Sequence, residues 1–137
     1  MALTPHFSAA SRNNMLDEIT AEIGTTAFLL IYAGVQPADV SSAVTAANVI
    51  IASLACPATN TFGVAATGIM TANAITSDTS AVGGTAAWFS FTKSTGLRVM
   101  DGSVGISAGV FDLVVGSVTI ATGSTVAISS FTVAFSA

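Results

Sequence analysis

Apolar side chains recur at helical spacing in one part of the chain, residues 8–23. Ser8 can accept the free N–H groups at the start of a helix there, and Gly24 is a natural stop. Pro5 disfavours helical geometry in the residue before it, so residues 1–7 are expected to form an extended arm. The apolar face of the predicted helix consists of Met15, Leu16, Ile19 and Ile23.

After residue 24 the apolar residues come in short runs bounded by Gly, Pro, Ser, Thr or Asn, a pattern typical of β-strands. The run at residues 25–33 is nearly continuous and predicts a strand buried on both faces, whereas the polar stretch 76–85 predicts a loop. A break in the alternation at residues 129–130 predicts a bulge. About eight strands are expected, at residues 25–33, 48–55, 67–74, 87–92, 97–100, 109–115, 117–120 and 125–135.

One helix followed by short strands predicts a mainly-β fold. Its expected architecture is a jelly-roll-like antiparallel β-sandwich, with a small barrel as the alternative. No strand–helix–strand unit is visible, and a length of 137 residues fits a single domain spanning residues 1–137.

Residues 85–105 contain the most aromatic part of the chain and predict a β-hairpin. A polar turn at residues 93–96 separates the two strands, and Asp101-Gly102 predicts a second turn after them. Large side chains are rare in this sequence, so the few aromatic residues are expected to anchor the core. The candidate core anchors are Tyr32, Trp88, Phe89 and Phe91.

The chain has very little charge, because Asp, Glu, Lys and Arg make up 7% of it against about 25% in an ordinary soluble domain. Such a surface suits a subunit covered by neighbours better than a free monomer. A net charge of −4 with three basic residues disfavours nucleic acid as a partner.

A mean hydropathy of +0.80 raises the question of a membrane span. The most apolar stretch, residues 40–56, is short, contains several Ser, Thr and Asn residues and lacks basic flanks, so no membrane association is expected. Cys56 is the only cysteine, which excludes an internal disulfide and predicts a small buried side chain.

Candidate chemistry is sparse. His6 is the only histidine and lies in the predicted arm, so a Ser–His–Asp arrangement is not expected. One Cys and one His do not supply a zinc site. Asp78, Asp101 and Asp112 could in principle gather around calcium, but each fits a turn or loop. The sequence therefore predicts a protein that is not an enzyme and has no cofactor and no metal.

Several segments resemble one family in sequence. They are F-L-L-I-Y-A-G-V-Q-P-A at 28–38, M-T-A-N-A-I-T-S-D-T-S-A at 70–81, G-T-A-A-W-F-S-F at 84–91, D-G-S-V-G at 101–105 and V-A-I-S-S-F-T-V-A-F at 126–135. With them the chain resembles small structural proteins encoded beside the major capsid protein of tailed bacteriophages, some of which are cement, or decoration, proteins. The resemblance implies a jelly-roll-like β-sandwich, often dimeric, seated on the capsid surface of the virion.

The expected function is therefore that of a capsid cement protein, which binds the major capsid protein and itself, as a homodimer or another homo-oligomer. Two alternatives stay open: a tail or head–tail connector component, and a head fibre that binds glycans through Trp88 and Tyr32. The arm and the start of the helix are expected to contact other subunits, with Phe7, Arg12 and Met15 as candidate contact residues.

Overall fold

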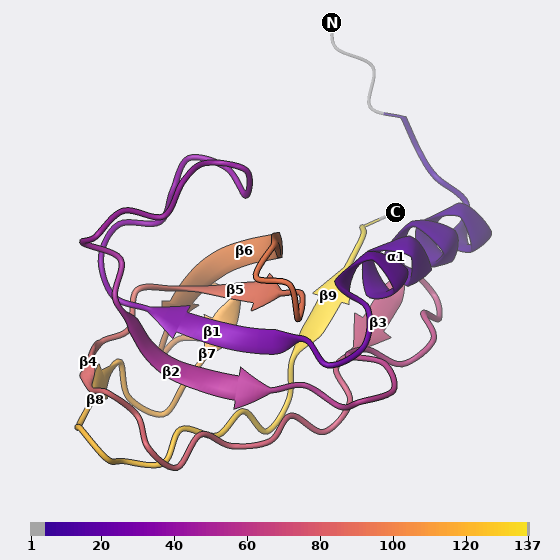
Figure 1. Ribbon diagram of the computed structural model, residues 1–137. Coiled ribbons are helices and arrows are strands. Elements are labelled where there is room, and N and C mark those ends of the chain that lie inside the picture. Colours follow the sequence, from indigo (N-terminus) through magenta and orange to yellow (C-terminus); the bar gives the residue numbers. More distant parts are fainter. Residues whose placement is uncertain (1–4, 137) are drawn as a thin grey trace, which may run out of the picture.

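The computed structural model describes residues 5–136. Its one helix, α1 (Ala9–Ile23), follows an exposed stretch at residues 5–8 (Figure 1). The Ser8 hydroxyl oxygen accepts a hydrogen bond from the Ser11 N–H at 3.1 Å, and Gly24, at a φ of 75°, donates its N–H to the helix. The predicted helix is thus confirmed with both of its ends. The first four residues of the predicted arm lie outside the described residues.

Nine strands follow the helix within residues 5–136, and five of them form one sheet in the order β2-β1-β5-β6-β7. Two short pairs, β3 with β9 and β4 with β8, complete the fold, and Figure 1 shows β3 and β9 on the side of the sheet where α1 lies. The strands are β1 (Phe28–Tyr32), β2 (Ile50–Ala55), β3 (Ile69–Thr71), β4 (Gly84–Thr85), β5 (Trp88–Thr92), β6 (Arg98–Gly105), β7 (Leu113–Val114), β8 (Thr119–Ile120) and β9 (Thr132–Ala134).

The hydrophobic core is built around the inner face of the five-stranded sheet, with α1 and the β3–β9 pair packed against it. Leu16 and Ile23 bring the apolar face of the helix into this core, and both are buried. Aromatic rings meet there with centroids 5.2–6.1 Å apart, a spacing at which they add stabilisation beyond their buried area. The four rings belong to Phe62, Phe89, Phe91 and Phe131.

A mainly-β fold with one helix is confirmed, but the expectation that all strands pair antiparallel was wrong. β6 and β7 run parallel, with Val104 opposite Leu113. Residues 106–112 between them carry the chain back to the level of Val104 before β7 begins, so β7 can run in the same direction as β6. Within this connection the N–H groups of Val110 and Phe111 both donate to the Ser107 carbonyl, at 3.3 and 3.4 Å.

The predicted second turn at Asp101-Gly102 was also wrong, because both residues continue β6. Gly102 marks a close approach instead of a turn: a Cβ atom placed on it would lie 2.6 Å from the Phe89 ring. In β1, Leu29 and Ile31 are buried in the core, and on the other face Tyr32 is buried and Leu30 half-buried. The strand is therefore nearly buried on both faces, except at its start, where Phe28 is 39% exposed.

Aspartate carboxylates accept hydrogen bonds from main-chain N–H groups at both sides of the five-stranded sheet. Along β2, the Asp78 carboxylate accepts the Ser53 N–H at 2.8 Å, and the neighbouring stretch 76–82 bonds to β2 on either side of it. On the other side of the sheet, the Asp112 carboxylate accepts the Ser103 N–H of β6 at 2.8 Å, one residue before β6 begins to pair with β7. We call Asp78 and Asp112 the edge aspartates. Within residues 5–136, no helix is long and apolar enough to cross a bilayer.

Candidate functional site

A cluster of aromatic and charged side chains lies on the outer face of the sheet, opposite the core. Tyr32 and Trp88 face each other across β1 and β5, and their rings stack with centroids 4.1 Å apart and planes 6° from parallel. The Arg98 guanidinium lies 5.5 Å from the centre of the Trp88 ring and forms an ion pair with Asp101. The side chains of Arg98 and Asp101 are only 7% and 6% exposed.

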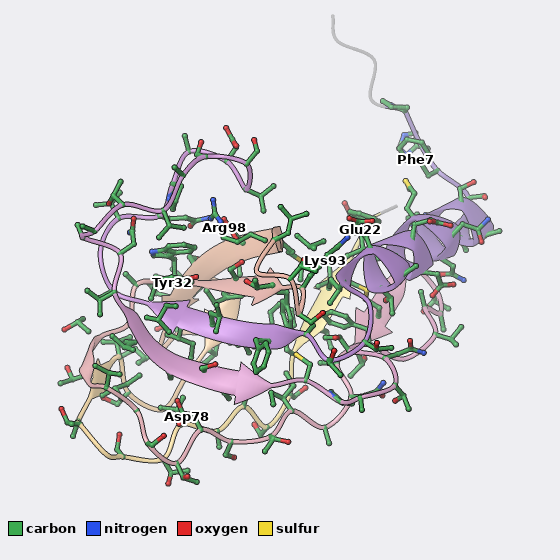
Figure 2. The ribbon with its side chains drawn as sticks, in the orientation of Figure 1. Phe7, Glu22, Tyr32, Asp78, Lys93 and Arg98 are labelled. Carbon is green, nitrogen blue, oxygen red and sulfur yellow. The ribbon has the colours of Figure 1, made fainter. Side chains whose placement is uncertain are left out.

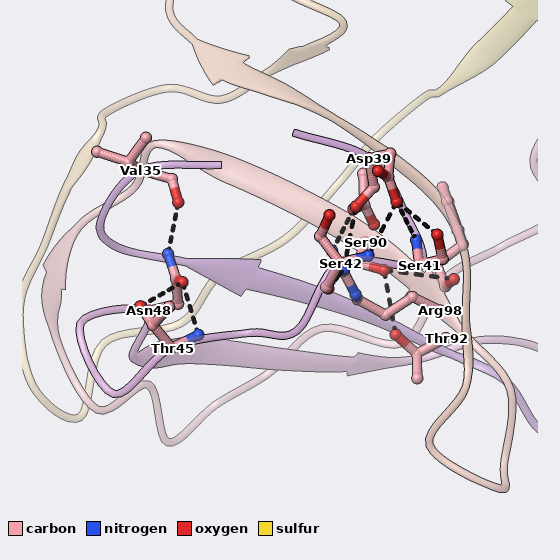
Figure 3. Close-up of polar contacts among 11 residues, drawn as sticks. Val35, Asp39, Ser41, Ser42, Thr45, Asn48, Ser90, Thr92 and Arg98 are labelled. Carbon is pink, nitrogen blue, oxygen red and sulfur yellow. Dashed lines mark hydrogen bonds and ion pairs between the residues drawn. The ribbon is translucent and has the colours of Figure 1, made fainter. Parts of the chain in front are cut away.

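The connection between β1 and β2 folds over this cluster, and we call residues 34–48 the strap (Figure 3). Arg98 donates hydrogen bonds to the carbonyl oxygens of Ser42 and Asp39. The Asp39 carboxylate accepts the N–H groups of Ser41 and Ser42 at 2.8 and 2.9 Å. At the other end of the strap, the Asn48 amide donates to the Val35 carbonyl at 2.7 Å. Arg98 therefore fastens the strap to the sheet.

Burial dominates the electrostatics of the cluster. It raises the pKa of Tyr32 above its ordinary value, because the phenolate would lose its hydration. The exposed Asp39 carboxyl differs: hydrogen bonds from Ser41 and Ser42 lower its pKa. Trp88 is 0% exposed, and its indole N–H has no hydrogen-bond partner within the described residues. The cluster thus has no open aromatic face on which a sugar could stack.

The four candidate core anchors are all buried, but in two places. Phe89 and Phe91 belong to the hydrophobic core, whereas Tyr32 and Trp88 lie under the strap on the other face of the sheet. Alternation along β5 produces this division, since successive side chains point to opposite faces. The strap itself had no clear signal in the sequence, because its apolar and polar residues show no regular period.

The three candidate contact residues lie together at the start of the molecule. Phe7 is 50% exposed and Met15 37% exposed, and Figure 2 shows Phe7 near the N-terminal end of α1, well away from the sheet. The Arg12 guanidinium donates a hydrogen bond to the Phe7 carbonyl at 2.6 Å. Arg12 also lies against Gly68, whose added Cβ atom would meet Arg12 Nε at 2.7 Å and the Phe135 carbonyl oxygen at 3.0 Å.

The helix behind these residues is held firmly to the body. The Asn13 side-chain oxygen accepts the Gly68 N–H at 2.8 Å, and the Asp17 carboxylate accepts the Ala65 N–H at 2.9 Å. At its other end, Glu22 forms an ion pair with Lys93 at 2.5 Å, across to the turn between β5 and β6 (Figure 2). The exposed Phe7 and Met15 are therefore presented from a fixed support.

The residues considered for metal or acid–base chemistry are kept apart. Asp78, Asp101 and Asp112 each have a separate partner, and within residues 5–136 no group of three or more His, Cys, Asp or Glu side chains could hold a metal ion. His6 lies in the exposed arm. Cys56 is buried, and burial raises the pKa of its thiol, which favours the unreactive protonated form.

The sequence did not predict the exposed apolar turn that the structure shows at residues 106–111. Ile106 is 62% exposed and Val110 71% exposed, and the Phe111 ring covers Gly105 at the end of β6. The available signal was the segment G-I-S-A-G-V-F, in which large apolar residues stand among glycines and small residues instead of in a strand pattern. This turn is therefore an exposed apolar feature separate from the arm.

Comparisons with protein-family models, with curated proteins and with solved structures find no match to this chain.

Proposed function

We propose that this chain is a non-enzymatic cement, or decoration, protein of a bacteriophage capsid. In this proposal it resides in the virion, on the capsid surface, and binds the major capsid protein. The sequence resemblance described above motivates the proposal, and one structural observation carries it: a rigid β-rich body with 7% charged residues exposes large apolar side chains. Those more than half exposed are Val35, Val64, Val82, Leu97, Ile106 and Val110.

A low charge and exposed apolar loops fit a protein that is covered on several sides. A monomer in solution normally needs more charge to remain dispersed, whereas contacts to a shell bury apolar surface and gain from the hydrophobic effect. A jelly-roll-like sandwich is part of the proposal. The five-stranded sheet and the β3–β9 pair, which share one core, support a two-layered arrangement of that kind.

The mechanism follows from repetition. Each contact between the cement protein and the shell can be weak, because a dimer that spans two capsid subunits makes its second contact at a high effective concentration. Binding to the assembled shell, and not to its dissociated subunits, then stabilises the shell by mass action. Phe7 and Met15 are suited to contacts between subunits, since both are exposed on a support fixed to the body.

The test is quantitative mass spectrometry of purified virions, before and after mild denaturant removes the protein. We expect a copy number near that of the major capsid protein, and stripped heads that burst more readily. A copy number of about six or twelve would instead place the protein in a ring of the tail or neck. Absence from the particles would refute a virion role of any kind.

A further inference from the structure

A groove of about 290 Å³ lies between β6 and β9, two strands that do not pair with each other. Its residues include two aromatic residues of the core, Phe89 and Phe131, and the two acidic residues Asp101 and Asp112. The strand segments that line its sides are Met100–Asp101 of β6 and Thr132–Ala134 of β9. We call this the β6–β9 groove.

The main chain of β6 directs free hydrogen-bonding groups into the groove. The Val104 N–H donates toward β5, to the Ala87 carbonyl, whereas the Ser103 N–H points the other way, to the Asp112 carboxylate. Main-chain groups of successive residues in a strand point to opposite sides, so residues two apart point to the same side. The N–H and C=O of Asp101, two residues before Ser103, therefore also point away from β5.

The main chain of β9 also directs free hydrogen-bonding groups into the groove, from the side opposite β6. The Phe131 carbonyl accepts from Ala72 and the Phe135 N–H donates to Gly68, so the odd-numbered residues of β9 face β3. Thr132 and Ala134 consequently direct their N–H and C=O groups away from β3. Within residues 5–136, no hydrogen bond involves the main-chain groups of Thr132 or Ala134 on this side.

We propose that the β6–β9 groove receives an extended segment from a second copy of this chain, its N-terminal arm around residues 5–7. The arm adds a strand between Asp101 on one side and Thr132 and Ala134 on the other. Strand addition of this kind satisfies free main-chain groups, while side-chain pockets select the residue inserted. Phe89 and Phe131, both buried, form the floor of the groove, which the Phe7 side chain would cover. This proposal does not depend on the capsid function proposed above.

The position of the arm favours this occupant. The arm joins α1 beside the end of β9, because Arg12 in the first turns of the helix lies against Gly68, next to the Phe135 carbonyl. Each arm therefore begins near the mouth of its own groove. Two copies related by a two-fold axis can then exchange arms reciprocally, which is the symmetry of most protein dimers.

Charge and reach agree with the same occupant. No acidic residue precedes Asp17 in the sequence, so the arm brings no negative charge to a groove that holds the Asp112 carboxylate. A strand rises about 3.3 Å per residue, so residues 5–7 span about 10 Å and pass both Thr132 and Ala134.

Sedimentation velocity of three full-length proteins tests the proposal. Ala134→Pro removes the N–H that points into the groove and leaves the bonds to β3 intact, since proline is tolerated where a strand N–H faces outward. Phe7→Asp alters only the exposed arm. We expect a wild-type dimer and at least about tenfold weaker self-association for each variant. Ala134→Ser keeps the N–H and should dimerise like the wild type, and far-ultraviolet circular dichroism checks that every variant is folded.

Mixing the two defective variants gives the decisive result. Ala134→Pro keeps a working arm and Phe7→Asp keeps a working groove, so the mixture should form a heterodimer through one arm in one groove. A wild-type protein that stays monomeric up to its solubility limit would overturn the proposal. So would dimers of unchanged affinity in both variants, or two folded monomeric variants that fail to associate when mixed. None of these results alters the copy number in virions, so the proposed function is tested separately.

Discussion

Arg98 shows how one side chain can organise a face of this molecule. It is buried with Asp101, lies over Trp88 and binds two carbonyl oxygens of the strap, so it joins residues from three segments of the chain. A buried ion pair adds little net stability compared with a well-packed apolar pair, but removal of one partner leaves a buried charge without compensation. The consequence of losing Arg98 is therefore large and depends on whether Asp101 is still present.

We expect Arg98→Met to lower the free energy of unfolding by about 3–5 kcal/mol, because the Asp101 carboxylate is left unpaired and the strap loses its attachment. Trp88 should then emit at longer wavelength as water reaches it. Urea unfolding followed by tryptophan fluorescence measures both effects. The double variant Arg98→Met with Asp101→Leu should recover most of the lost stability. Equal losses in the single and double variants would show that the charge is not the cause.

Asp78 gives a prediction for acid pH. Hydrogen bonds from the N–H groups of Ser53 and Ser80 lower its pKa in the folded protein, so the folded state holds the ionised form more strongly than the unfolded chain does. The stabilisation is present above the unfolded pKa of about 3.9 and is lost as pH falls through the lower, folded value. Melting temperatures between about pH 2 and pH 6 should fall less steeply for Asp78→Asn than for the wild type. Parallel curves would refute this role.

Strand β6 is the element on which sequence and structure differ most. The sequence predicts a hairpin strand that ends at Met100, yet β6 continues to Gly105 because Gly102 allows the Phe89 ring to approach its backbone. We expect Gly102→Ala to cost about 1–3 kcal/mol in stability through overpacking. Gly116→Ala is the matched control, since an added Cβ atom there meets nothing within 4 Å. Thermal unfolding of both variants decides the matter, and similar melting temperatures would contradict the packing explanation.

The elements that could be predicted are those whose signal is local. The helix follows from Ser8, Gly24 and a regular apolar face, and β5 follows from its aromatic run. The shortened strands could not be predicted in the same way. Val126 is buried outside the named strands, where it makes only an isolated antiparallel bridge with Asp78, a pairing that depends on tertiary structure. Similarly, the β6–β9 groove depends on which strands become neighbours, a property that no single segment of sequence contains.

At the scale of the whole molecule, the same sequence carries two kinds of surface. Small polar residues and a few carboxylates cover the loops, whereas Phe7, Ile106 and Val110 expose apolar area at separate places. The exposure of these residues could not be read from the sequence, because an apolar residue in a core strand and one in an exposed turn look alike there. What the sequence did indicate is the shortage of charge, and that shortage agrees with a molecule whose surface is covered by neighbours.

The edge aspartates have a further consequence for a solution of this protein. A chain rich in strands and poor in charge is at risk of joining sheet to sheet without limit, as amyloid fibrils do, because unpaired strand edges act as templates. Asp78 and Asp112 place a carboxylate on the N–H groups of Ser53 and Ser103, where an incoming strand would have to bind. A strand cannot pair at Ser53 or Ser103 without displacing a carboxylate, so open-ended growth is disfavoured there and strand addition is directed to the β6–β9 groove, where a reciprocal exchange ends at two copies.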